Sequence, residues 1–242
     1  MARSENAERV NIAVKINRKV MPLFFLIDVS GSMRGSRIQA VNVAMRDVVR
    51  NLRELAKKMP SIQYEVRILT FGNNSAMWKY GTPEKGIPLE EYEWVEIRDS
   101  ECEGRTPMGE CISLLKEVMA EDTYKSCLGS RICAPFVLLL SDGLANGKKN
   151  LDESIYDVHN SYVGKLAHFV AIGIALKEET AVRNLQKFGV SGMVSADDDP
   201  AKLAEFISLI TSSSIQQESK IHTSREDMAE NVRYQSEEIY ET

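Results

Sequence analysis

The stretch LFFLIDVSGSMRGS, residues 23–36, decides the fold because it joins an apolar run directly to a polar loop. The apolar residues before Asp28 are typical of a strand buried on both faces, and such strands belong to parallel sheets that helices cover. Ser30 and Ser32 follow Asp28 at alternate positions. Alternate residues of an extended chain point to the same side, so we expect these three polar side chains to face one point.

Strand-like and helix-like segments alternate along most of the chain. Apolar residues at helical spacing predict a helix from Ser36, a candidate cap, to just before Pro60. The alternation predicts an α/β fold with a doubly wound, mostly parallel sheet and one antiparallel edge strand. The other predicted strands are 64–71, 76–80, 134–143, 167–175 and 190–196, with 93–98 extended, and the other helices begin near Thr106, Asp152, Thr180 and Pro200.

The composition is that of one globular domain with polar ends. We expect a domain at residues 21–212, a polar N-terminal segment at 1–20 and a polar, charge-rich tail at 213–242. The N-terminus has no secretory apolar core, and no apolar stretch reaches the roughly 18 residues that span a bilayer, so we expect no membrane contact and a cytoplasmic location. The formal net charge is −5 without a basic stripe, which argues against nucleic acid as a partner.

Cysteines and histidines give no catalytic or zinc pattern. The four cysteines have no CxxC spacing and are expected to be ordinary thiols, with Cys111 on an apolar helical face. None of the three histidines accompanies an obvious nucleophile, which argues against a Ser/His/Asp or Cys/His hydrolase. These residues are Cys102, Cys111, Cys127, Cys133, His159, His168 and His222.

A second acid, Asp142, ends the predicted strand 134–143 as Asp28 ends the first strand. Ligands of open α/β sheets bind at the carboxyl ends of strands, where the strand order reverses. If the two strands are neighbours, both carboxylates face one crevice, which Thr106 can reach as the N-cap of a helix that starts at Pro107. The candidate ligands are Asp28, Ser30, Ser32, Thr106 and Asp142, all hard oxygen donors that suit Mg²⁺, or Mn²⁺ and Ca²⁺. The alternative is that Asp28 and the serines only bond local backbone amides.

The segments DVSGS, RTPMG and LLLSDG together resemble the metal-ion-dependent adhesion site (MIDAS) of von Willebrand factor type A (VWA) domains. The resemblance covers about residues 20–212 and implies a Rossmann-like sheet. It also implies that Ser30 and Ser32 bind the ion directly and that an open coordination position takes a carboxylate from a protein partner. Arg105 stands where the family has a glycine before the threonine, which makes that loop more cationic and suits an acidic partner.

Within the family, the chain is similar to cytoplasmic bacterial TerY-like proteins of tellurium resistance. That likeness implies a role in a bacterial stress-response or defence system, with a kinase or phosphatase of the same system as partner. Two other functions stay open. One is a Mg²⁺-dependent aspartyl phosphotransferase or phosphatase with Asp28 as nucleophile, although Ser30 stands where such enzymes need a second Asp. The other is a structural adaptor whose site is occupied but unused.

Overall fold

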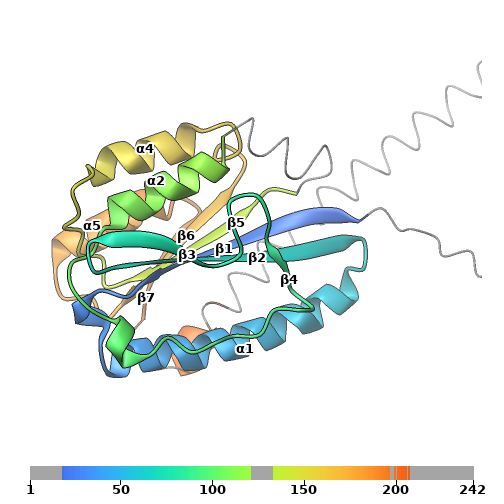
Figure 1. Ribbon diagram of the computed structural model, residues 1–242, viewed down its shortest axis with the longest axis horizontal. Helices are drawn as coiled ribbons and strands as arrows, with labels where there is room; N and C mark the ends of the chain where they lie inside the picture. The colour runs from blue at the N-terminus through green and yellow to red at the C-terminus, as the bar shows by residue number, and fades with distance from the viewer. Residues whose placement is uncertain (1–17, 121–132, 197–198, 200, 206, 208–242) are drawn as a thin grey trace, which may run out of the picture.

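A computed structural model describes residues 18–120, 133–196, 199, 201–205 and 207. A seven-stranded sheet is covered by helices on both faces (Figure 1). The strands are β1 (Lys19–Asp28), β2 (Ile62–Gly72), β3 (Ser75–Tyr80), β4 (Ile87–Pro88), β5 (Phe136–Ser141), β6 (His168–Ile174) and β7 (Gly192–Ala196). The labelled helices are α1 (Ser36–Lys58), α2 (Met108–Val118), α4 (Leu151–Asn160) and α5 (Glu179–Phe188), with single 3-10 turns η1 (Gly31–Met33) and η2 (Asp99–Glu101). Residues 201–205 are also helical, which agrees with the helix predicted near Pro200.

The strand order is β3-β2-β1-β5-β6-β7, with β4 paired to β2 off this path. Strands β1, β2, β5, β6 and β7 are parallel, and β3 is antiparallel at the edge, which confirms the predicted sheet. The two-residue β4 is a second antiparallel piece that the sequence did not predict. The chain runs outward from β1 in both directions, so the strand order reverses between β1 and β5 and their carboxyl ends border the crevice predicted for ligands.

The side chains of the central strand β1 contribute to two separate apolar layers, one on each face of the sheet. Leu23, Phe25 and Ile27 pack with the buried face of α1, whereas Phe24 and Leu26 pack with α2, α4 and α5. Figure 1 shows α1 below the sheet and these three helices above it. All five side chains are fully buried, as the continuous apolar run predicts for a strand covered on both sides.

Helix α1 begins one position differently from its prediction. Ser36 is its first helical residue, and the residue in the N-cap position is Gly35 with φ 85, which favours glycine. The helix ends at Lys58, before Pro60 as predicted. The apolar positions of the predicted stripe are all buried, which confirms the helical spacing; they are Ile38, Val41, Met45, Val48, Leu52 and Leu55.

The segment predicted to be extended at 93–98 is not a strand. Its backbone is held by a side chain: the N–H of Ile97 donates to Asn42 Oδ1 at 2.9 Å, and Asn42 Nδ2 donates to the carbonyl of Ile97 at 2.8 Å. Asn42 is a buried polar residue of α1. One amide therefore satisfies both backbone groups, and this segment packs across α1 instead of joining the sheet.

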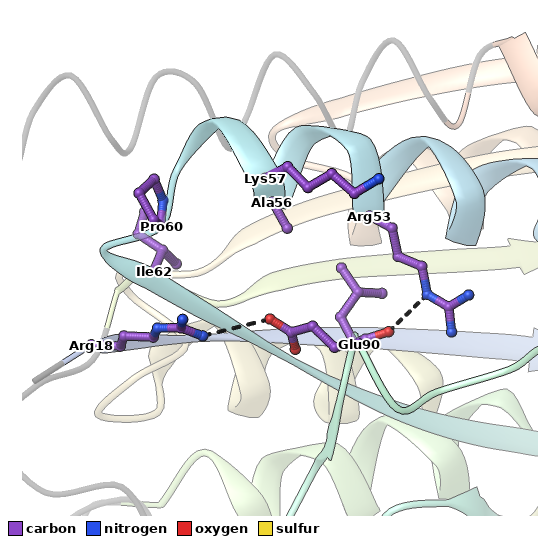
Figure 2. A pocket seen from close by; sticks show the side chains of 8 residues that line it. Arg18, Arg53, Ala56, Lys57, Pro60, Ile62 and Glu90 are labelled. Atoms are coloured by element: carbon purple, nitrogen blue, oxygen red, sulfur yellow. Dashed lines mark hydrogen bonds and ion pairs between the residues drawn. The ribbon is translucent and has the colours of Figure 1, made fainter. Parts of the chain in front are cut away.

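A cavity of about 400 Å³ lies at the amino ends of β1 and β2, at the other end of β1 from Asp28 (Figure 2). Its charged side chains have partners. Arg18 forms an ion pair with Glu90 at 3.7 Å, and Arg53 Nε donates to the carbonyl of Leu89 at 3.1 Å. These contacts join α1 and the residue before β1 to the turn after β4, so we interpret the cavity as a packing feature of that junction.

Several predicted features lie outside the described residues. These are the tail at 213–242, most of the segment 1–20, Cys127 and His222, so the domain boundaries at 21 and 212 stay predictions. Among the described cysteines, Cys102, Cys111 and Cys133 are buried free thiols. In the described ranges, no helix is both long and apolar enough to cross a membrane.

Candidate metal-binding site

Asp28 is the last residue of β1 and is fully buried. Its Oδ1 accepts a hydrogen bond from the N–H of Ser30 at 2.8 Å, and its Oδ2 accepts one from the hydroxyl of Ser141 at 2.6 Å. Burial raises the pKa of the Asp28 carboxyl to about 7; the hydrogen bonds oppose the rise, and the charge of Asp142 adds to it. A carboxylate in this position is held in one orientation and is stabilised by any cation that lies beside it.

Ser30 and Ser32 place their hydroxyls together, as the alternation predicts. Their Oγ atoms are 3.1 Å apart and share a hydrogen bond. Ser30 is buried and Ser32 is exposed in the turn η1, so the pair reaches from the buried carboxylate to the surface. The site is therefore open toward solvent on the side of Ser32.

Asp142 directly follows β5, the neighbour of β1, and is 5% exposed. The two predicted acids thus lie at adjacent carboxyl ends, which confirms the expected placement of the strands. Asp142 Oδ1 accepts a hydrogen bond from the N–H of Leu144 at 3.3 Å, and its Oδ2 accepts one from Arg37 Nη1 at 3.0 Å. Asp142 is consequently oriented by its own loop and by the first turn of α1.

Thr106 lies at the site edge but does not cap a helix, which corrects the prediction. Helix α2 starts at Met108, and Pro107 precedes it with a non-helical ψ of 58. The N–H of Thr106 donates instead to Asn146 Oδ1 at 2.6 Å, and its carbonyl accepts from the N–H of Asn146 at 3.1 Å. Thr106 is 3% exposed, so the loop after β5 fixes its backbone and leaves its hydroxyl outside any capping bond.

Backbone hydrogen bonds hold the 103–105 loop against the Asp28 loop. The N–H of Gly31 donates to the carbonyl of Gly104 at 3.1 Å, and the N–H of Glu103 donates to the carbonyl of Val29 at 3.0 Å. Gly104 has φ 68, and a Cβ there would lie 2.8 Å from the Cα of Asn73, so this position requires glycine. These bonds bring the chain leading to Thr106 beside the serine pair.

Three residues that the sequence analysis did not single out position the ligand candidates. Ser141 donates to Asp28, Arg37 donates to Asp142, and Asn146 holds Thr106. Ser141 ends β5 and Asn146 lies in the loop that follows it, and both belong to the stretch SDGLAN that includes Asp142, so the polar residues around that acid are the signal that could have identified them. Arg37 carries no comparable signal because its contact depends on where α1 starts.

The donor set fits a hard divalent cation. Two buried carboxylates and three hydroxyl side chains come from the carboxyl ends of β1 and β5, the turn that follows β1 and the loop before α2, and hard oxygen donors are those that Mg²⁺, Mn²⁺ and Ca²⁺ prefer. No cluster of three or more His, Cys, Asp or Glu side chains suited to a metal occurs among the described residues. A cation bound here would offset the negative charge that burial makes costly at Asp28.

The raised pKa of Asp28 predicts a specific pH dependence in chelator-treated protein. The carboxyl has its ordinary pKa of 3.8 in the unfolded chain and a pKa of about 7 in the fold, so the folded state binds more protons between these values. The contribution of Asp28 to the free energy of unfolding is therefore greatest at low pH and falls by up to about 1.4 kcal/mol per unit as the pH rises from about 4 to about 7. Asp28→Asn should flatten this slope.

Urea unfolding at about pH 5 and about pH 8 measures the slope. Asp152→Asn is the matched control. Asp152 lies at the start of α4, and its exposed carboxylate pairs with Lys187 of α5. That control should keep the slope of the unchanged protein. An equally steep slope in Asp28→Asn would show that another group carries the pH dependence.

Comparisons with solved structures find the same fold in other proteins. A proximal thread matrix protein (PTMP1) from the mussel byssus is 16% identical, with a TM-score of 0.51 over 81% of this chain and 46% of its own. The BatB protein of Bacteroides thetaiotaomicron is 13% identical, with a TM-score of 0.52 over 80% of this chain and 99% of its own. The pilus adhesin SpaC of Lactobacillus rhamnosus GG is 12% identical, with a TM-score of 0.60 over 82% of this chain and 30% of its own.

The likeness is structural, because neither a scan against family models nor a search of curated proteins finds a match. This chain spans less than half the length of PTMP1. One structure of PTMP1, with a TM-score of 0.50 at 16% identity, has a MIDAS motif occupied by zinc. The sheet order, the helices on both faces and these neighbours together show that the chain has a VWA-like, Rossmann-type fold.

Proposed function

We propose that this protein is a metal-dependent interaction module, in which a divalent cation held at the end of β1 binds a carboxylate of a protein partner. The observation that carries the proposal is the convergence of two buried acids and a serine hydroxyl pair at the β1–β5 switch point. When bound, the cation supplies an electrophilic centre for an anionic oxygen. The protein residues orient the ligands and leave the Ser32 side open to a partner.

The cation is proposed to be Mg²⁺, with Mn²⁺ and Ca²⁺ as alternatives. Neutral hydroxyls are weak donors, so two carboxylates and three hydroxyls leave a divalent ion able to accept a further anionic ligand. The zinc in the MIDAS motif of PTMP1 supports a divalent ion at such a motif in the same fold. Zinc therefore belongs among the ions tested.

The finer assignment is a bacterial stress-response or defence protein of the TerY-like kind. The resemblance of DVSGS, RTPMG and LLLSDG to the MIDAS motif supports the interaction role, and the kinase or phosphatase partner follows from the TerY likeness alone. We propose a cytoplasmic location on the same basis. An acidic partner segment would suit the exposed Arg105 beside the site.

We propose that no bond is broken at this site. An aspartyl phosphotransferase needs a free nucleophilic oxygen on Asp28 and a general acid two residues later. Here both carboxylate oxygens accept hydrogen bonds, and the residue two positions later is Ser30. Absence of a covalent phosphate on Asp28 after incubation with acetyl phosphate and Mg²⁺, measured by intact mass, is the expected result.

The deciding experiment is calorimetric titration of chelator-treated protein with Mg²⁺, Mn²⁺, Ca²⁺ and Zn²⁺. We expect a single saturable site, and we expect a partner captured from bacterial lysate to be released by chelator. No saturable binding of any ion, with or without acetate as a carboxylate donor, would contradict the proposal. Binding of an ion without any chelator-sensitive partner would favour the occupied but unused adaptor.

A further inference from the structure

Arg37 contacts both halves of the candidate site. Its Nη1 donates to Asp142 Oδ2 at 3.0 Å and to the carbonyl of Ser32 at 3.1 Å. The Arg37 side chain is 16% exposed and that of Asp142 is 5% exposed, so the pair is largely shielded from water. Ion pairs in such surroundings are screened much less by salt than pairs on the surface. The positive charge of Arg37 therefore lies within the site, beside the Asp142 carboxylate, and not only at its outer surface.

The guanidinium changes the charge that a cation meets. Asp28 and Asp142 would together contribute two negative charges, which formally balance a divalent ion. Arg37 contributes one positive charge beside Asp142, and arginine stays protonated at all physiological pH values. The site with Arg37 thus carries one net negative charge, and a divalent ion bound there leaves one positive charge without compensation.

Two more arginines lie on the loops around this site. Arg34 follows the turn η1, and Arg105 precedes Thr106; both are exposed. Because neither is buried, their charges act mainly on a molecule that approaches from solvent. The uncompensated charge of the ion and these two side chains would favour the same kind of partner, an acidic segment.

We propose that Arg37 is a built-in counter-ion that weakens the hold of the domain on its cation and couples cation binding to the carboxylate of an acidic partner. This inference rests on the proposed function. Arg37 partly neutralises Asp142, so the protein alone binds the ion weakly. A partner carboxylate then supplies the missing negative charge, and the ion and the partner bind together.

The test measures Mn²⁺ affinity by electron paramagnetic resonance in buffer free of carboxylates, with and without added acetate. Arg37→Gln should bind Mn²⁺ about tenfold more tightly or better, since a positive charge near the ion is removed. Arg37→Lys keeps the charge and should stay within about threefold of the unchanged protein. Arg34→Gln is the matched control for an exposed arginine on the same loop and should change affinity by less than about twofold.

Acetate separates coupling from affinity. Acetate should tighten Mn²⁺ binding in the unchanged protein and tighten it less in Arg37→Gln. Equal or weaker Mn²⁺ affinity in Arg37→Gln, with thermal unfolding unchanged in chelator, would overturn the role of Arg37 and leave the metal-dependent function standing. Absence of Mn²⁺ binding in every variant, with acetate present, would overturn the metal-dependent function itself.

Discussion

Asp28→Asn is expected to weaken Mg²⁺ binding by about 100-fold or more, because loss of residues that only support metal ligands already costs about 10–100-fold. Asparagine keeps the size of the side chain and an acceptor for the N–H of Ser30. It removes the negative charge at the most buried of the ligand candidates. Calorimetric titration with Mg²⁺ and Mn²⁺ measures the loss, and chelator-sensitive partner binding should be lost with it.

The variant should stay folded, which makes the result interpretable. At about pH 8 and in chelator, Asp28→Asn is expected to be at least as stable as the unchanged protein, since the cost of a buried charge at Asp28 is gone. Asp152→Asn, with the same change of charge on an exposed side chain, should bind Mg²⁺ normally. Normal Mg²⁺ affinity in Asp28→Asn would mean that the ion binds elsewhere or without this carboxylate.

Phe25→Ala is expected to lower the free energy of unfolding by about 3–5 kcal/mol, the range typical of a buried phenylalanine truncated to alanine. Phe25 is fully buried in the central strand, between Ile68 of β2 and Leu138 of β5, in the layer that faces α1. The side chain is enclosed by elements on three sides, so the cavity left behind should collapse poorly. Urea unfolding followed by far-UV circular dichroism measures the change.

Met77→Ala is the control for this prediction. Met77 lies on the edge strand β3 and is 58% exposed, so its truncation should change stability by less than about 0.5 kcal/mol. A loss of less than about 1 kcal/mol in Phe25→Ala would contradict the prediction, because it would show that this buried side chain contributes little more to stability than an exposed one. A Mg²⁺ titration of the refolded variant would then show whether the site survives a loosened core.

Local sequence patterns were enough to predict most of the framework. The apolar run before Asp28 and the helical spacing after Ser36 each identify their own segment. A strand buried on both faces has a continuous apolar run, whereas a helix buried on one face has apolar residues at every third or fourth position. The acids at the ends of β1 and β5 could be placed together because parallel strands end at one edge. These inferences need the identity of each element but not the positions of distant side chains.

Features that depend on distant partners escaped prediction. Thr106 and Pro107 form a good local signal for a helix start, yet the bonds of Thr106 with Asn146 hold it outside the helix. The segment around Ile97 is not a strand, and its backbone takes its hydrogen-bond partner from Asn42 on α1. The contact of Arg37 with Asp142 could not be predicted either, because it depends on how α1 lies relative to the end of β5.

The backbone bonds of the 103–105 loop have a consequence for how recognition could change. Glu103 is joined to Val29 and Asn73 through its main chain, and Gly104 is joined to Gly31 in the same way. Main-chain bonds do not depend on which side chain a residue carries. The Glu103 side chain also accepts a hydrogen bond from Asn73 Nδ2 at 2.8 Å, but this bond is exposed, so positions 103 and 105 can be diversified while the main-chain bonds keep the serine pair in place. A library randomised at these two exposed positions, with Gly104 kept, would separate the choice of partner from the capture of the ion, and new specificities could arise without rebuilding the site.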